Sequence, residues 1–249
     1  MYQHPPSPPS ESLPTMYDLP SEDPNDSGVP DEFHVFQPQL LRETFRPPNF
    51  SIDEIFVAAD INLYYDVRHT LWYKRPDWFA VVGAPRSTQQ QDLRLSYVIW
   101  QERISPVLVV ELLSPGTEDE DLGQTLRDAD KPPTKWEVYE QILRVPYYVV
   151  FDRYENRFRA YDLRLDRYQE RDLSEGKFWI EDVQLGLGLW RGIYEGVEGV
   201  WLRWYEANGR WIPTLAEQAE YGRQRAEQER QRAERLAAQL RALGIEPDL

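Results

Sequence analysis

The chain has 249 residues, of which 41% are hydrophobic and 13% aromatic, so it is long enough to bury a core. Its formal net charge of −15 counts against a large nucleic-acid footprint, because phosphate binding depends mainly on Lys and Arg. The absence of cysteine excludes disulfides, thiolate zinc sites and a cysteine nucleophile. With only three scattered histidines, any metal is expected to bind to carboxylates, which suit Mg²⁺, Mn²⁺ or Ca²⁺.

Residues 1–34 are rich in Pro, Ser, Asp and Glu and contain no Lys or Arg. Such a composition cannot bury enough apolar surface to order itself, so it predicts a flexible acidic tail. The beginning of the chain does not have the pattern of a signal peptide, and no apolar run approaches the ~20 residues of a spanning helix. We therefore expect a cytoplasmic protein without membrane contacts.

Residues 35–212 contain the patterns of a folded domain. Apolar segments that favour strands occur at 55–66, 78–82, 97–100, 107–113, 145–151, 157–163 and 167–172. The segment 107–113 is apolar on both faces, which predicts a central buried strand whose single charge is Glu111. A helix is expected to start at Thr134 as N-cap and to carry Lys135, Tyr139 and Ile142 on one face.

Residues 213–249 change in character. From 215 to 243 the segment has no proline, one glycine (Gly222), and many Ala, Glu, Gln and Arg residues, which favour a long helix with i,i+4 charge pairs. Leu236, Leu240 and Leu243 fall on one stripe, but the earlier turns have almost no apolar seam. A single solvated helix and a coiled coil both remain open.

Three residues in chain order could carry chemistry. Asp77 follows Pro76 at the start of a strand, Glu111 lies inside the next buried strand, and Lys135 opens the following helix. Burying a lone carboxylate is costly, whereas two carboxylates on adjacent strands could bind one divalent ion. Taken singly, Asp77 could be a turn residue, Glu111 an edge or Arg-paired residue, and Lys135 a solvated residue; only their combination indicates a site.

Several motifs accompany these residues, namely the segments 75–83, 106–117, 119–123, 135–139 and 145–152. The glutamate strand that ends in Ser114-Pro115, the Lys135-x-x-x-Tyr139 spacing and Val145-Pro146-Tyr147-Tyr148 are the most specific of them as a set. On these residues the chain resembles the Uma-type restriction endonucleases, a bacterial family of the PD-(D/E)xK nuclease superfamily, over roughly residues 50 to 195.

The resemblance implies an α/β fold with a restriction-endonuclease-like core, in which helices flank a central mixed β-sheet and a long C-terminal helix follows. It implies that Asp77 and Glu111 bind Mg²⁺ or Mn²⁺. The superfamily usually places a lysine two residues after the second acid, where this chain has Leu113, so Lys135 is expected to supply that lysine, with Lys131 as the competing candidate. Asp60 matches a recurrent acid of the family, which implies that it assists the site. The alternative is that Asp60 is a hydrogen-bonded residue at the end of a strand.

We therefore expect the chain to consist of three segments: a flexible acidic tail at 1–34, a nuclease-like domain at 35–212 and a helical or coiled-coil-like tail at 213–249. The function expected from the resemblance is Mg²⁺-dependent hydrolysis of DNA phosphodiester bonds by a metal-activated water. The alternative, favoured by the acidic charge, is a catalytically weak or inactive nuclease fold that serves as an interaction module. An RNA substrate and a homodimer are both left open.

Overall fold

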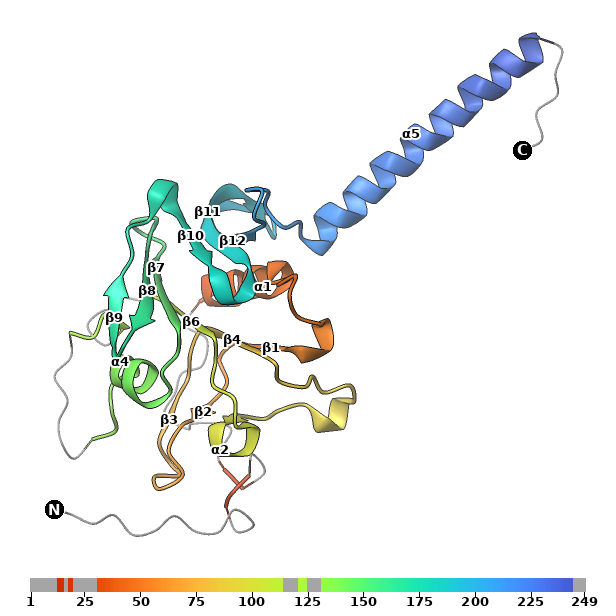
Figure 1. The fold of residues 1–249 in the computed structure, drawn as a ribbon. Helices are drawn as coiled ribbons and strands as arrows, with labels where there is room; N and C mark the ends of the chain where they lie inside the picture. The colour runs from red at the N-terminus through yellow and green to blue at the C-terminus, as the bar shows by residue number, and fades with distance from the viewer. Residues whose placement is uncertain (1–12, 16–17, 20–30, 114–120, 125–130, 244–249) are drawn as a thin grey trace. The chain divides into compact units, whose positions relative to one another are not determined.

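A computed structural model describes residues 13–15, 18–19, 31–113, 121–124 and 131–243. The chain divides into two compact units, Met1–Trp211 and Ile212–Leu249. The first unit is mixed α/β, as the sequence predicts, and is built on a six-stranded sheet of order β1-β4-β6-β7-β8-β9 (Figure 1). Its strands are β1 (Ile55–Ala58), β4 (Trp78–Val82), β6 (Leu108–Leu112), β7 (Tyr147–Asp152), β8 (Arg157–Arg164) and β9 (Arg167–Glu170).

Two smaller sheets complete the first unit. One is an antiparallel meander of β10 (Lys177–Ile180), β11 (Leu185–Tyr194) and β12 (Val197–Tyr205). The other, of order β3-β2-β5, consists of β2 (Leu63–Tyr64), β3 (Tyr73–Lys74) and β5 (Tyr97–Val98). The helical elements are α1 (Phe33–Thr44), η2 (Ile52–Glu54), η3 (Gln90–Asp92), α2 (Ile99–Glu102), α4 (Lys135–Glu137), η4 (Val138–Ile142), η5 (Ser174–Gly176) and η6 (Glu181–Val183).

Strand β6 lies at the centre of the six-stranded sheet, and all five of its residues are buried. It pairs antiparallel with β4 and parallel with β7, so the sheet is mixed, as predicted. The continuous apolar run around Glu111 is the pattern expected of a strand covered on both faces. Glu111 itself is 0% exposed, and its carboxylate is therefore held inside the molecule.

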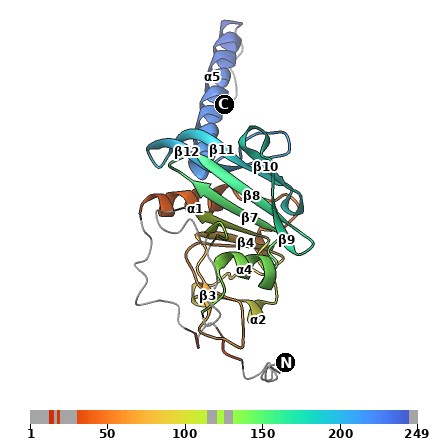
Figure 2. The ribbon, with the colours of Figure 1, turned by 90° about the vertical axis from the view of Figure 1, so that its left-hand side faces the viewer.

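One face of the six-stranded sheet packs against α1 and β12, which lie side by side (Figure 1, Figure 2). The rings of Phe45, Trp78 and Trp204 form an aromatic cluster there, with centroids 5.0–6.0 Å apart. Gln37 of α1 donates to the carbonyl of Leu202 and accepts from its N–H, both at 2.9 Å. These contacts anchor α1 against the strand pair that contains β12.

Some residues of the predicted acidic tail belong to the folded unit. Residues 33–34 form the first turn of α1, where sequence reasoning had ended the tail at residue 34. Leu19 is buried with Tyr64 and Val98, and the indole N–H of Trp100 donates to the carbonyl of Pro14 at 2.8 Å. Residues 1–12, 16–17 and 20–30 lie outside the described ones, so the tail and its boundary stay predictions.

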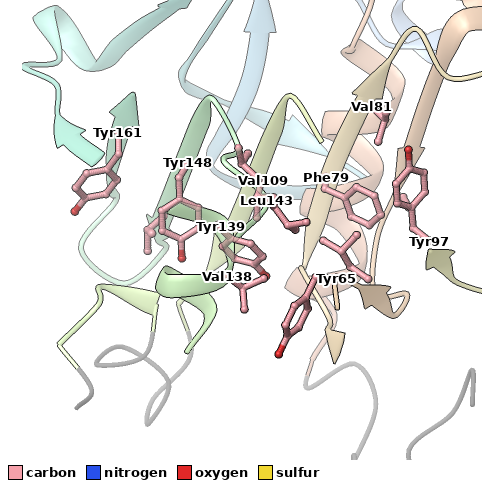
Figure 3. Packing of buried hydrophobic residues seen from close by; sticks show 14 of the residues in the cluster. Tyr65, Phe79, Val81, Tyr97, Val109, Val138, Tyr139, Leu143, Tyr148 and Tyr161 are labelled. Atoms are coloured by element: carbon pink, nitrogen blue, oxygen red, sulfur yellow. The ribbon is translucent and has the colours of Figure 1, made fainter. Parts of the chain in front are cut away.

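The opposite face of the sheet packs against η4 and the small β2-β3-β5 sheet. Figure 3 shows Val138, Tyr139 and Leu143 in the same layer as Val109 and Tyr148. Sequence reasoning placed Ile142 on the face of Lys135 and Tyr139, whereas its side chain is 43% exposed. The reason is that 138–142 form a π-helical turn, in which a spacing of seven no longer returns to the same face.

The second unit contains the long helix α5 (Leu215–Ala242), which confirms the predicted C-terminal helix. It starts with a capping box, in which Thr214 and Glu217 bond each other's backbone N–H groups. Arg–Glu pairs three or four residues apart follow its exposed surface, as in Arg225–Glu229 and Arg230–Glu227. Within the part of the chain that the structure describes, no helix is apolar enough over a sufficient length to cross a membrane.

Candidate functional site

Asp77 and Glu111 face each other across two neighbouring strands. The register of β4 and β6 pairs Trp78 with Val110, which places Asp77, just before β4, opposite Glu111. The backbone N–H of Asp77 donates to Oε2 of Glu111 at 3.3 Å, and the N–H of Leu112 donates to Oδ2 of Asp77 at 2.7 Å. The antiparallel pairing thus brings together two carboxylates that lie 34 residues apart in the chain.

Both oxygens of Glu111 accept hydrogen bonds from side chains of the helix that follows. The hydroxyl of Tyr139 donates to Oε1 at 2.8 Å, and Nζ of Lys135 lies 3.1 Å from Oε2. The carboxylate is therefore fixed at each oxygen, which is how a buried charge is tolerated in an apolar interior.

Lys135 owes its position to the start of α4. Thr134 caps this helix in a capping box with Glu137, so the chain enters the helix with Lys135 as its first residue. The ammonium group also pairs with Asp121 Oδ1 at 2.9 Å, and 19% of the lysine side chain is exposed. Lys131, by contrast, is exposed, and among the described residues no hydrogen bond or ion pair joins it to either acid.

The electrostatics of the cluster are dominated by burial. Burial raises the pKa of Glu111 to about 7; the charge of Asp77 acts in the same direction, and Lys135 acts against it. Burial also raises the pKa of Asp77, again opposed by Lys135 and by the N–H of Leu112. Burial alone would lower the pKa of Lys135, but Glu111, Asp121 and Asp77 raise it well above its ordinary value. The lysine is therefore charged. Its single positive charge does not offset the effect of burial on the two carboxyl groups, whose pKa values stay raised.

The backbone of Asp60 lies next to Pro76, the residue before Asp77, but its side chain faces Arg75. Its N–H donates to the carbonyl of Pro76 at 3.1 Å, and its backbone adopts a left-handed conformation with φ of 52°. Its carboxylate lies 3.7 Å from Arg75 Nε and is 41% exposed. A role for Asp60 in the site stays a prediction.

Three residues of the site were given no role by sequence reasoning. Tyr139 was expected only to pack, and Asp121 lies in an acidic stretch where no single residue stands out. His34 is buried in α1, and its Nε2 lies 3.2 Å from the carbonyl of Leu112, the residue after Glu111. Its Nδ1 lies 2.9 Å from Asp31 Oδ1, and Arg153 donates to the other oxygen of Asp31 at 2.6 Å. A lone histidine on a helix face gives no signal of such a contact.

The carboxylate oxygens of this cluster are of the kind that divalent cations bind. Three carboxylates, Asp77, Glu111 and Asp121, surround the single positive charge of Lys135, which leaves an excess of negative charge. Asp77 is partly exposed, so a cation and a water could reach it from solvent. Hard oxygen ligands are those that Mg²⁺ and Mn²⁺ prefer. Among the described residues no group of three or more His, Cys, Asp and Glu side chains has a metal-binding arrangement. The assignment of Asp77 and Glu111 as metal ligands stays a prediction.

Two carboxylates face each other at the central strands of a mixed sheet, and a lysine from the helix that follows lies beside them. These features define an α/β protein with a carboxylate–lysine site. A family model, Uma2, described as a putative restriction endonuclease, matches residues 23–193. Since the match covers more than half of the chain, the protein belongs to the Uma2 family. No curated protein matches the chain.

Proposed function

We propose that the protein is a metal-dependent endonuclease that hydrolyses DNA phosphodiester bonds at the cluster of Asp77, Glu111 and Lys135. The observation that carries the proposal is the position of Lys135, whose Nζ lies 3.1 Å from Oε2 of Glu111, the oxygen that also accepts from the N–H of Asp77. Membership of the Uma2 family supports the nuclease chemistry. The choice of DNA and of Mg²⁺ or Mn²⁺ follows from the family resemblance and from the oxygen ligands.

In this proposal each residue has a separate task. Asp77 and Glu111 would hold the ion, which would polarise a phosphoryl oxygen and make a water more acidic. Lys135 stabilises the negative charge that develops on the phosphate, and its exposed fraction leaves a path to the substrate. Tyr139 fixes the orientation of the Glu111 carboxylate, and Asp121 fixes Lys135.

The test is incubation of the full-length protein with supercoiled plasmid DNA and either Mg²⁺ or Mn²⁺. We expect nicked and then linear DNA with the wild type, and none with Glu111→Gln, which keeps the shape of the side chain but removes its charge. Glu198→Gln, a change at an exposed position in β12, is the matched control and should cleave like the wild type. Cleavage by Glu111→Gln at the wild-type rate would assign any activity to another site.

One observation favours the second candidate, an inactive nuclease fold that acts as an interaction module. The polar groups of the cluster already satisfy one another, because Glu111 accepts at both oxygens and Lys135 pairs with two acids. A purely structural ion-pair network would have this appearance. Absence of cleavage by the wild type with either metal, on both single-stranded and double-stranded DNA, would favour this alternative.

A further inference from the structure

A pocket with several arginines in its lining lies at the edge strand β1, and none of its lining residues belongs to the cluster of Asp77 and Glu111. It has a volume of about 300 Å³ and is open to solvent. Arginines from separate parts of the chain line it: Arg42, Arg46, Arg86 and Arg94. None of its lining residues is acidic, although the chain as a whole carries a formal net charge of −15. Positive charge is thus concentrated in one place on an acidic protein.

Most of this positive charge is not neutralised within the fold. Arg94 is paired with Glu102 at 2.7 Å and lies over the ring of Phe56 at 4.6 Å. Arg46 donates to the backbone carbonyls of Arg42 and Phe45. Among the described residues Arg42, Arg46 and Arg86 form no ion pair with a carboxylate.

The charges of Arg46 and Arg86 influence each other. Burial lowers the pKa of Arg46, and the positive charge of Arg86 acts in the same direction, against the opposite effect of Glu43. An anion bound between two guanidinium groups would reduce the electrostatic repulsion between them. Guanidinium groups bind phosphate oxygens through several N–H donors at once, which makes phosphate a suitable anion.

The same pocket has an apolar wall. Ile52 and Leu93 are 56% and 55% exposed, and Phe50 beside them is only partly buried. A small inorganic anion would gain nothing from these side chains. A nucleotide unit would use both parts, because its phosphate is anionic and its sugar and base present apolar faces that stack on aromatic rings.

We propose that this pocket binds a phosphodiester group of a nucleic-acid strand, with the adjoining sugar and base against Phe50, Ile52 and Leu93. The proposal rests on the proposed function in taking nucleic acid as the substrate. Asp77 immediately precedes β4 and Arg86 follows its end by four residues, so the two sites lie at opposite ends of this strand. Five residues of strand span ~16 Å at ~3.3 Å each. A nucleic-acid strand with the spacing of a B-form duplex, ~3.4 Å per nucleotide, therefore covers about five nucleotides between the two sites.

The test measures DNA binding without catalysis. Fluorescence anisotropy of a labelled single strand of about 12 nucleotides, long enough to span the distance above, is recorded with the full-length protein in EDTA over a range of salt concentrations. The variant is Arg42→Gln/Arg86→Gln. Its matched control is Arg191→Gln/Arg232→Gln, which removes the same charge from two exposed positions outside the pocket. Circular dichroism checks that both variants fold.

We expect the pocket variant to lose affinity by roughly tenfold per arginine and its salt slope to fall by about 1 per arginine, while the control stays near the wild type. Equal losses in the two variants would overturn the proposal, as would wild-type protein that does not bind the strand. Inorganic phosphate that competes as well as the oligonucleotide at equal concentration would also overturn it. Because binding is measured in EDTA, failure of plasmid cleavage with intact, pocket-dependent binding would refute only the proposed function.

Discussion

The hydroxyl of Tyr139 donates a hydrogen bond of 2.8 Å to Oε1 of Glu111, although both side chains are completely or almost completely buried. This bond joins the central strand β6 to the π-helical turn of η4. It places a structural side chain in direct contact with a candidate metal ligand, so stability and metal binding are expected to depend on one another at this position.

Replacing Tyr139 by Phe should destabilise the protein by about 1–3 kcal/mol, because the buried oxygen of Glu111 loses its donor. Urea unfolding followed by tryptophan fluorescence at neutral pH measures the change. Tyr221→Phe is the control, since this tyrosine of α5 is 60% exposed and should change the stability little. Equal free energies of unfolding for both variants would show that the Tyr139 bond contributes nothing.

The two candidate lysines can be separated by a pair of substitutions. Lys135→Ala should reduce DNA cleavage by about 10²–10³-fold under saturating metal, because it removes a positive charge next to the candidate ligands. Lys131→Ala should cleave close to the wild-type rate, because Lys131 is exposed before Pro132. The reverse pattern would transfer the role to Lys131.

The stability of the metal-free protein should depend on pH through Glu111. Its pKa rises from 4.5 to about 7 on folding, so below pH 4.5 the group is protonated in both states and contributes nothing. As the pH rises towards 7 the unfolded state ionises more readily, and the free energy of unfolding falls; above pH 7 the loss is complete. In EDTA, the wild type should therefore lose stability between pH 5 and 8 relative to Glu111→Gln. A constant difference between the two over that range would contradict the shift.

Metal binding should be measurable without any substrate. We expect Mg²⁺ or Mn²⁺ to raise the melting temperature of the wild type, since a ligand at 100 times its Kd stabilises by about 2.7 kcal/mol. Isothermal titration should give heat with the wild type and none with Asp77→Asn/Glu111→Gln. Equal binding by both proteins would remove these acids from the role of ligands.

Deleting residues 213–249 should leave the first unit folded, because α5 belongs to a separate compact unit. Leu236 of α5 is 51% exposed and Leu243, its C-cap, is 74% exposed. The shortened protein should keep the circular dichroism of the strands and unfold cooperatively. With so weak an apolar seam, the isolated helix should self-associate weakly or not at all, which sedimentation tests. An insoluble or unfolded product would place the tail in the core.

The sequence predicted the mixed sheet because its signals are local and strong. The run 107–113 has no polar face, and the capped start at Thr134 marks the helix that carries Lys135. The contacts of His34 and Asp121 were not predictable, because they depend on how α1 and the segment around residue 121 pack against strands far away in the chain. The exposure of Ile142 was missed for a different reason, since a π-helical turn breaks the spacing on which a helical pattern depends.

The parallel pairing of β6 with β7 bears on when the candidate site is complete during folding. In this sheet it is the only parallel pair among the described strands, and it requires a long crossover between Leu112 and Tyr147. Lys135, Tyr139 and Asp121 all lie on that crossover, whereas Asp77 and Glu111 meet through the antiparallel pair β4–β6. The contact between Asp77 and Glu111 closes a separation of 34 residues and that between Glu111 and Lys135 one of 24, so both are non-local and carry a similar entropic cost of loop closure. The complete cluster therefore requires both the β4–β6 and the β6–β7 pairing, and in a refolding chain it is expected to form only together with the central sheet.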